Sequence, residues 1–160
     1  MPGTGASMVH MYHSAMTCIR ASRPEEGARA IEIWRHAVDA THDFLSPQDR
    51  AEIDEMVCGF LPHAPLWFAV DEQDHPLAFM LIDQGHMEAL FVDPAFRHRG
   101  LGAALVRHGL ALQRDRMAET IARHFPPGTR ATRPEGGYFL WLELPPGCDA
   151  WALYQRALQH

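Results

Sequence analysis

The stretch from Met87 to Leu112 constrains this 160-residue chain more than any other, because it joins a strand, a glycine loop and a helix in that order. Residues 87–92 are apolar except for Glu88, and the Asp93-Pro94 pair that follows ends the run, as is typical of a short buried strand. From Leu101 onwards, leucine and valine recur at the spacing of one helix face. The glycine loop between these elements is therefore expected at a helix N-terminus.

That loop, Arg97-His98-Arg99-Gly100-Leu101-Gly102, has the composition of an anion-binding site. Glycine carries no side-chain acceptor, so the first N–H groups of the helix stay free and the backbone comes close to a ligand. The helix dipole favours an anion at this end, and two arginines add positive charge. The alternative is a solvated helix start with glycines for a tight turn. We predict a site for a pyrophosphate.

The loop and its surroundings resemble the acetyl-coenzyme A (acetyl-CoA) loop of the GNAT N-acetyltransferases. The matching pattern is Arg97-x-x-Gly100-x-Gly102, preceded by a strand that ends in Leu90-Phe91-Val92-Asp93-Pro94. The resemblance runs from about Thr17 to Leu112 and is similar to small bacterial enzymes. It implies an enzyme that moves the acetyl group of acetyl-CoA directly to a primary amine of a small molecule or peptide. The alternative is a hybrid protein that binds acetyl-CoA with impaired catalysis, or is only structural.

The resemblance also implies which residues hold the cofactor. Backbone groups of the strand would hold the pantetheine and acetyl groups, and the loop with the first helical turn would hold the pyrophosphate. The expected cofactor-binding residues are Leu90, Phe91, Val92, Arg97, Arg99, Gly100, Leu101, Gly102, Ala103 and Ala104.

Glu88 and His86 are the predicted catalytic residues. They are two apart, so on a regular strand they share a face. Glu88 is an acid inside an apolar strand, and burial would raise its pKa toward that of a useful general base. The alternatives are an exposed or arginine-paired Glu88 and a solvated His86 beside a turn. The tyrosine that serves as general acid in the family would fall in a segment that this sequence replaces.

Acceptor contacts are expected near the junction of the first two helices, which lines the acceptor cleft in the family. Asp43 suits a cationic amine, although it equally suits a helix end. Aromatic residues would line the pocket or form part of the core. The predicted acceptor residues are Trp34, His42, Asp43, Phe44 and Trp67.

The fold predicted for the front of the chain is α+β, with a mostly antiparallel sheet flanked by helices. The pattern predicts a strand from Thr17, helices over 23–44 and 47–61, strands over 65–70 and 76–82, the strand from Met87 and the loop helix. Ser22 with Glu25, and Ser46 before Pro47, are the expected helix caps. Ile31, Trp34, Val38 and Leu45, then Ile53, Met56, Val57 and Phe60, are expected to face the core.

After Leu112 the sequence departs from the GNAT pattern. The loop helix continues to about Phe125, and strands over 128–134 and 138–144 precede a last helix capped by Asp149. Residues 113–160, above all Arg133 to Pro145, resemble the small C-terminal domain of fold-type I aminotransferases, as fused in PLP-dependent regulators. PLP chemistry is excluded, because the 14 basic residues are all arginine and a Schiff base needs a lysine.

Charge and cysteine content indicate which binding partners and which cellular environment suit this chain. Residues 1–94 hold 15 acids and 5 arginines, whereas residues 95–160 hold 5 acids and 9 arginines. An acidic front half suits a cationic acceptor and makes nucleic acid an unfavourable partner. The three widely spaced cysteines suit a reduced, cytoplasmic protein rather than a metal or disulfide framework. No apolar run reaches the length of a membrane span.

The expected domain organisation follows from these patterns. Residues 1–15 are expected to be a disordered leader, with Met16 as an alternative start. Residues 16–160 form a single GNAT-like domain, with an acetyl-CoA part over 16–112 and an atypical part over 113–160. The tail's strands either extend the sheet or leave an edge that pairs with a second chain, and we expect a homodimer.

Overall fold

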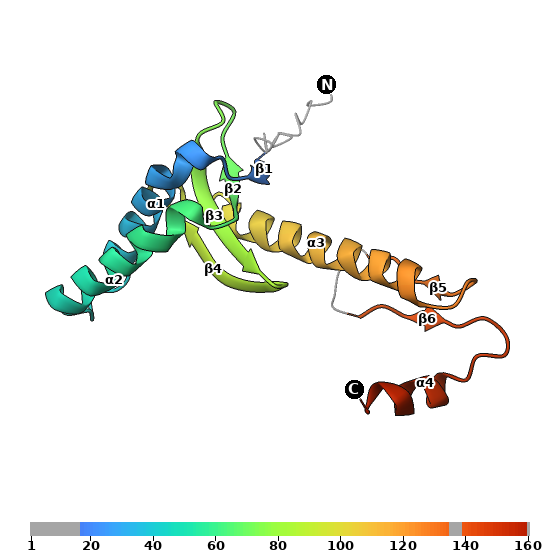
Figure 1. Cartoon of the computed structure of the whole chain (residues 1–160). Helices are drawn as coiled ribbons and strands as arrows, with labels where there is room; N and C mark the ends of the chain where they lie inside the picture. Colours follow the sequence, from blue (N-terminus) through green and yellow to red (C-terminus); the bar gives the residue numbers. More distant parts are fainter. Residues whose placement is uncertain (1–16, 135–138, 160) are drawn as a thin grey trace, which may run out of the picture. The chain divides into compact units, whose positions relative to one another are not determined.

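The computed structural model describes residues 17–134 and 139–159. They group into two compact units, one ending at Leu105 and one beginning at Val106. Figure 1 shows the elements of the first unit, which are β1 (Cys18–Ala21), η1 (Pro24–Glu26), α1 (Gly27–Asp39), α2 (Pro47–Phe60), η2 (Leu61–His63), β2 (Leu66–Val70), β3 (Pro76–Asp83), β4 (His86–Val92) and η3 (Pro94–Phe96). Helix α3 (Leu101–His124) begins in the first unit and continues into the second.

The first unit is built on a four-stranded antiparallel sheet in the order β1-β2-β3-β4. Short turns join β2 to β3 and β3 to β4, so sequential strands pair as neighbours. This arrangement confirms the predicted fold class and the antiparallel meander. Strands β1 and β4 are the edges of this sheet.

Both faces of the sheet are buried. On one face, α1 and α2 pack on β2 and β3 through a core of buried side chains that includes Ile33, Trp34, Val57, Phe68 and Phe79. The other face carries a second core, in which Ala69, Ala78 and Met80 pack against Leu101 and Leu105 of the first turns of α3. The start of α3 is therefore fixed against the sheet, and with it the loop that precedes it.

The helices of the first unit are shorter and more exposed than the sequence pattern predicts. The predicted helix over 23–44 is η1 followed by α1, which ends at Asp39. In α2 only Val57 is buried, and Met56 and Phe60 are exposed, so their predicted core positions are wrong. Ile53 is partly buried and packs against the same core as Val57.

Helix capping was predicted correctly at α2 and incorrectly at η1. The Ser46 hydroxyl accepts a hydrogen bond from the Asp49 N–H at 3.1 Å, as a cap does. Ser22 instead accepts the Leu66 N–H at 3.2 Å, which ties the end of β1 to β2. Glu26, not Glu25, reaches back to the Arg23 N–H at 2.8 Å.

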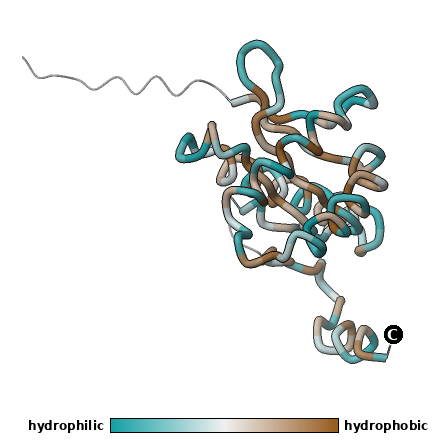
Figure 2. The backbone as a smooth tube through the Cα atoms, turned by 90° about the vertical axis from the view of Figure 1, so that its left-hand side faces the viewer, coloured by the Kyte–Doolittle hydropathy of each residue, from teal (hydrophilic) through white to brown (hydrophobic). Residues whose placement is uncertain are grey.

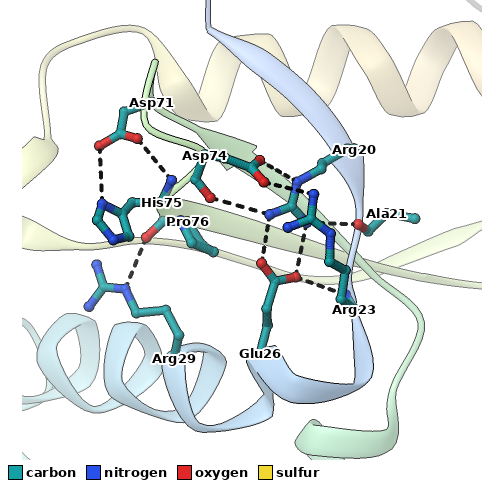
Figure 3. Close-up of polar contacts among 9 residues, drawn as sticks. All are labelled: Arg20, Ala21, Arg23, Glu26, Arg29, Asp71, Asp74, His75 and Pro76. Atoms are coloured by element: carbon teal, nitrogen blue, oxygen red, sulfur yellow. Dashed lines mark hydrogen bonds and ion pairs between the residues drawn. The ribbon is translucent and has the colours of Figure 1, made fainter.

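An ion-pair cluster around Arg20 fastens the β2–β3 turn to the start of α1 (Figure 3). The Arg20 guanidinium donates to Glu26 at 2.6 and 2.9 Å and to Asp74 at 2.6 Å. Asp74 has a φ of 65°, an uncommon backbone conformation for a residue with a Cβ. Hydrogen bonds from Arg20, with partial burial opposing them, hold the pKa of the Glu26 carboxyl below its usual value.

We predict that this cluster makes the free energy of unfolding fall as the pH becomes acidic. The folded-state pKa of Glu26 lies below its unfolded value, so its contribution is complete above about pH 4.3 and is lost as the pH falls through the folded pKa. Glu26→Gln should lower the free energy of unfolding at pH 7 and flatten its decline in acid. Urea denaturation followed by tryptophan fluorescence at pH 7, 5 and 3.5 measures both effects.

Glu25→Gln is the matched control, because Glu25 is the exposed neighbour of Glu26. It should leave the acid dependence of the wild-type protein unchanged. Equal acid dependence in Glu26→Gln and wild type would contradict the role of the cluster.

The second unit contains most of α3, the two-stranded antiparallel pair β5 (Arg130–Ala131) and β6 (Leu142–Glu143), and α4 (Ala150–Ala157). The predicted continuation of α3 and the last helix are confirmed, and the strand pair forms within the predicted ranges, although β5 and β6 have only two residues each. Asp149 accepts hydrogen bonds from the Trp151 and Ala152 N–H groups, as predicted for the cap. Figure 2 shows both hydrophobic and hydrophilic residues in the helix beside the C-terminus, which is α4.

Two sequence expectations concern residues that the structure does not describe. The expected leader over residues 1–15 lies outside the described ranges, and so does the predicted turn over residues 135–137 between the two tail strands. Within the described ranges, none of the helices has both the length and the apolar character needed to cross a membrane.

Candidate functional site

The candidate site is a pocket of about 500 Å³ in the first unit. The pocket lies where the end of α1, the second half of β4, the glycine loop and the start of α3 come together. It is lined by Ala37, Thr41, His42, Leu90, Phe91, Val92, Phe96, Arg97, His98, Gly100, Leu101 and Gly102. Seven of the ten predicted cofactor residues are among them.

The glycine loop has the backbone conformation that its sequence suggested. Gly100 has a φ of 79°, a region in which a side chain is strained. His98 also has a positive φ of 63°, which is uncommon for a residue with a Cβ. These two positions turn the chain from η3 into α3 and leave the loop against the pocket.

The first turn of α3 presents backbone donors toward this loop. The Ala104 N–H donates to the Gly100 carbonyl at 2.9 Å, and it is the first bond of the helix. Among the described residues, the N–H groups of Leu101, Gly102 and Ala103 donate no hydrogen bond to a group outside α3. These three groups and the positive end of the helix dipole favour an anion.

Arg97 and Arg99 take different positions. Arg97 is partly buried, lines the pocket, and forms no ion pair within the described parts of the chain. Arg99 is exposed, and its guanidinium lies 5.1 Å from the centre of the Phe96 ring. Arg97 therefore supplies positive charge to the pocket, whereas Arg99 packs over one of its walls.

Gly102 lines the pocket at the start of α3, next to Leu90 and Val92 of β4. A Cβ placed on it would lie 3.6 Å from Leu90 Cδ2 and 3.8 Å from Val92 Cγ2, which is ordinary van der Waals contact. A methyl group at this position therefore fits the protein and fills space on the ligand side of β4.

A buried ion pair holds the end of β4 in place. Asp93 is 4 % exposed, and its carboxylate accepts a hydrogen bond from Arg29 of α1 at 2.8 Å. Arg29 also donates to the Pro76 carbonyl at 2.9 Å, a contact shown in Figure 3. Burial alone would raise the pKa of Asp93, but hydrogen bonds from the Ala95 N–H and Arg29 outweigh it and lower this pKa. The corner between β4 and the loop is thus tied to α1.

Neither predicted catalytic residue lies in the pocket lining. Glu88 and His86 are exposed, so the predicted burial of Glu88 is wrong. The cause is the position of β4 at the sheet edge together with a register shift: Leu81 pairs with Ala89 and Ile82 with Met87, which leaves Glu88 without a partner. This bulge breaks the two-residue alternation that placed His86 and Glu88 on one face.

The predicted acceptor residues divide into three groups. His42 lines the pocket. Trp34 is 5 % exposed in the core between α1 and the sheet, and Trp67 packs against the other core, so both follow the alternative of core residues. Asp43 and Phe44 are exposed and lie outside the lining, although the Phe44 ring is 5.3 Å from that of His42.

Sequence reasoning missed Ala37, Thr41, Phe96 and His98 of the lining, and the pairing of Arg29 with Asp93. Phe96 stands beside the predicted loop and His98 lies within it, so counting every residue of the loop and its neighbour would have included them. Ala37 and Thr41 come from α1 and the residues after it, and their place in the pocket depends on tertiary packing. Among the described residues, no group of three or more metal-ligating side chains is gathered.

Comparison with known proteins identifies the class to which this fold and pocket belong. The sequence matches the Acetyltransferase (GNAT) family over residues 8–133. The chain is a member of the GNAT acetyltransferase family. The family match extends past Leu112, where the resemblance read from the motif ended.

Two relatives show the similarity in detail. Peptidyl-lysine N-acetyltransferase YjaB of Salmonella typhimurium is 58% identical over 97 residues, which cover 61% of this chain and 67% of the relative. The chain thus spans about two thirds of that protein's length. The solution structure of apo-form YjaB from Escherichia coli has a TM-score of 0.57 at 42% identity, and covers 72% of this chain and 83% of that one.

The chain also has a separate, shorter similarity. A stretch of 43 residues is 46% identical to 2-aminoadipate transaminase of Thermus thermophilus, and it covers 27% of this chain and 11% of that enzyme. This relative belongs to the aminotransferases, the class of enzyme that residues 113–160 were predicted to resemble.

Proposed function

We propose that this protein is an acetyl-CoA-dependent N-acetyltransferase that transfers an acetyl group directly to a primary amine. The observation that carries the proposal is the pocket between β4 and the start of α3, which joins free helix N–H groups, Arg97 and the end of a strand in one cavity. Family membership supports the same reaction. The activity named for the Salmonella relative suggests a lysine side chain of a peptide as the acceptor.

The residues of the pocket fit acetyl-CoA in their chemistry. The N–H groups of Leu101 to Ala103 and the Arg97 guanidinium suit the pyrophosphate. Leu90, Phe91 and Val92 provide backbone groups and an apolar surface for the pantetheine arm. Acetyl-CoA supplies the thioester whose carbonyl the amine attacks, and the protein holds both partners and excludes water from them.

The acceptor side of the pocket suits a cationic amine. Acidic residues outnumber arginines 15 to 5 in residues 1–94, the range in which the sheet and the first two helices lie. A negative field raises the local concentration of a positively charged acceptor. His42 and Thr41, which follow α1, are the polar residues on this side of the lining.

Isothermal titration with acetyl-CoA, followed by a transfer assay, tests the proposal. We expect micromolar binding, about −8 kcal/mol, and release of free CoA when a lysine-containing peptide is added. Binding without transfer to any amine in a panel of peptides and small amines would support the impaired-hybrid alternative. Absence of binding would overturn the proposal.

We further propose a cytoplasmic homodimer and an aminotransferase-like origin for the tail. Strand β4 is a sheet edge, and an unpaired edge strand is a template for pairing with another chain. The short transaminase match supports the origin of the tail. Size-exclusion chromatography with light scattering measures the oligomeric state, and a monomer would remove the dimer.

A further inference from the structure

The contacts of Thr41 determine the proton position on the His42 ring. The Thr41 hydroxyl donates to the Ala37 carbonyl at 2.8 Å, and its oxygen lies 2.9 Å from His42 Nδ1. A hydroxyl has one proton, and a carbonyl oxygen only accepts. Both contacts are therefore satisfied only if Nδ1 carries the proton and donates to Thr41.

This assignment leaves His42 Nε2 with a lone pair. In a neutral imidazole one nitrogen donates and the other accepts. His42 is partly buried and lines the pocket together with Leu90, Phe91 and Val92 of β4. The backbone also holds the residue, because the His42 N–H donates to the Val38 carbonyl at 2.8 Å. A ring oriented by a hydrogen bond on one nitrogen and free on the other is the arrangement of a general base.

We propose that His42 Nε2 takes the proton from the acceptor ammonium in the pocket, and that Thr41 is the positioning residue that fixes its tautomer. This inference rests on the proposed acetyl transfer. The ammonium gives one proton to Nε2, and the neutral amine then forms a C–N bond with the thioester carbonyl carbon. The C–S bond breaks, the second amine proton goes to the leaving sulfur, and His42 returns its proton to water.

Among the residues that line the pocket, His42 is the imidazole that a side-chain hydrogen bond orients. Arg97 and His98 are the other titratable side chains of the lining, and both come from the glycine loop. Arginine remains charged at working pH and takes up no proton. The β4 residues of the lining carry no titratable group, and neither do Ala37 of α1 or Leu101 and Gly102 of α3.

The first test is the pH dependence of transfer. A protonated imidazole cannot take up the acceptor's proton, so wild-type kcat/KM should fall toward acid pH. His42→Gln should lower kcat/KM about 100-fold at pH 7 and abolish this acid limb, with acetyl-CoA affinity unchanged by titration calorimetry. His63→Gln is the matched control, because His63 is an exposed histidine of η2 outside the pocket lining.

Thr41 variants separate positioning from packing. Thr41→Val removes the hydroxyl at nearly constant shape, and Thr41→Ser keeps it. We expect Thr41→Val to lower kcat about tenfold with little change in KM. Thr41→Ser should keep kcat close to the wild-type value. Ring ¹⁵N NMR of the full chain above pH 8 should show the Nδ1–H tautomer for His42 in wild type and Thr41→Ser, and its loss in Thr41→Val.

The outcomes distinguish this inference from the proposed function. Transfer that retains its acid limb in His42→Gln, or loses it in Glu88→Gln instead, would overturn the role of His42 and leave the acetyltransferase intact. An Nε2–H tautomer in wild type would likewise overturn the inference without any activity measurement. Absence of transfer by the wild-type protein to every amine would overturn both.

Discussion

Gly102→Ala should weaken acetyl-CoA binding about 100-fold, or about 2.8 kcal/mol at 1.4 kcal/mol for each tenfold, while the protein keeps its fold. The added methyl group meets Leu90 and Val92 at ordinary contact distances, so nothing in the protein has to move. It fills the space through which a pyrophosphate approaches the N–H groups of α3. Titration calorimetry measures the affinity, and thermal denaturation checks the fold.

Gly59→Ala is the control for this change. Gly59 lies in α2, is exposed, and has open space around the position of a Cβ. Alanine in a helix interior should stabilise the protein by about 0.5–1 kcal/mol and leave acetyl-CoA affinity unchanged. Wild-type affinity in Gly102→Ala would show that the pyrophosphate binds elsewhere.

Arg29→Ala should lower the free energy of unfolding by about 3 kcal/mol. The change leaves the buried carboxylate of Asp93 without its guanidinium and the Pro76 carbonyl without its donor. His36 Nδ1, at 3.5 Å from Asp93, is a weaker replacement. Because Asp93 precedes the glycine loop, we also expect weaker acetyl-CoA binding. Urea denaturation at pH 7 gives the first effect and calorimetry the second.

Glu32→Ala separates the buried pair from the surface pair. Arg29 also contacts Glu32 at 2.8 Å, and the side chain of Glu32 is 53% exposed. Removing this exposed partner should cost less than about 1 kcal/mol and leave binding unchanged. Equal losses from both variants would mean that burial of Asp93 adds nothing to the pair.

Most of the features that the sequence predicted correctly depend on residues that are close together in the chain. The glycine loop, the strand before it and the helix after it are adjacent in sequence, so their residue types and spacing report directly on backbone geometry. The positive φ of Gly100 and the uncapped start of α3 follow from that local chemistry. The pairing of β2 with β3 and of β3 with β4 followed from the short turns between them.

Tertiary structure decided what the sequence could not show. Glu88 has the pattern of a buried residue, but β4 lies at a sheet edge and a register shift displaces it, which depends on the pairing partner. Met56 and Phe60 match a helical stripe, yet α2 buries only Val57. Arg29 and Asp93 are 64 residues apart, and nothing in either segment indicates that they meet.

The ion pairs of this protein have a consequence for its chemical durability. Arginines supply the guanidinium groups that fasten the sheet to α1 and α1 to α2, namely Arg20, Arg29 and Arg35. Acetylation of a lysine removes its charge and its salt bridge, whereas a guanidinium is not an amine acceptor. A chain of 160 residues with no lysine therefore offers no side-chain amine to the acyl donor that its pocket suits. The framework around the pocket is protected from the reaction that the pocket is proposed to carry out.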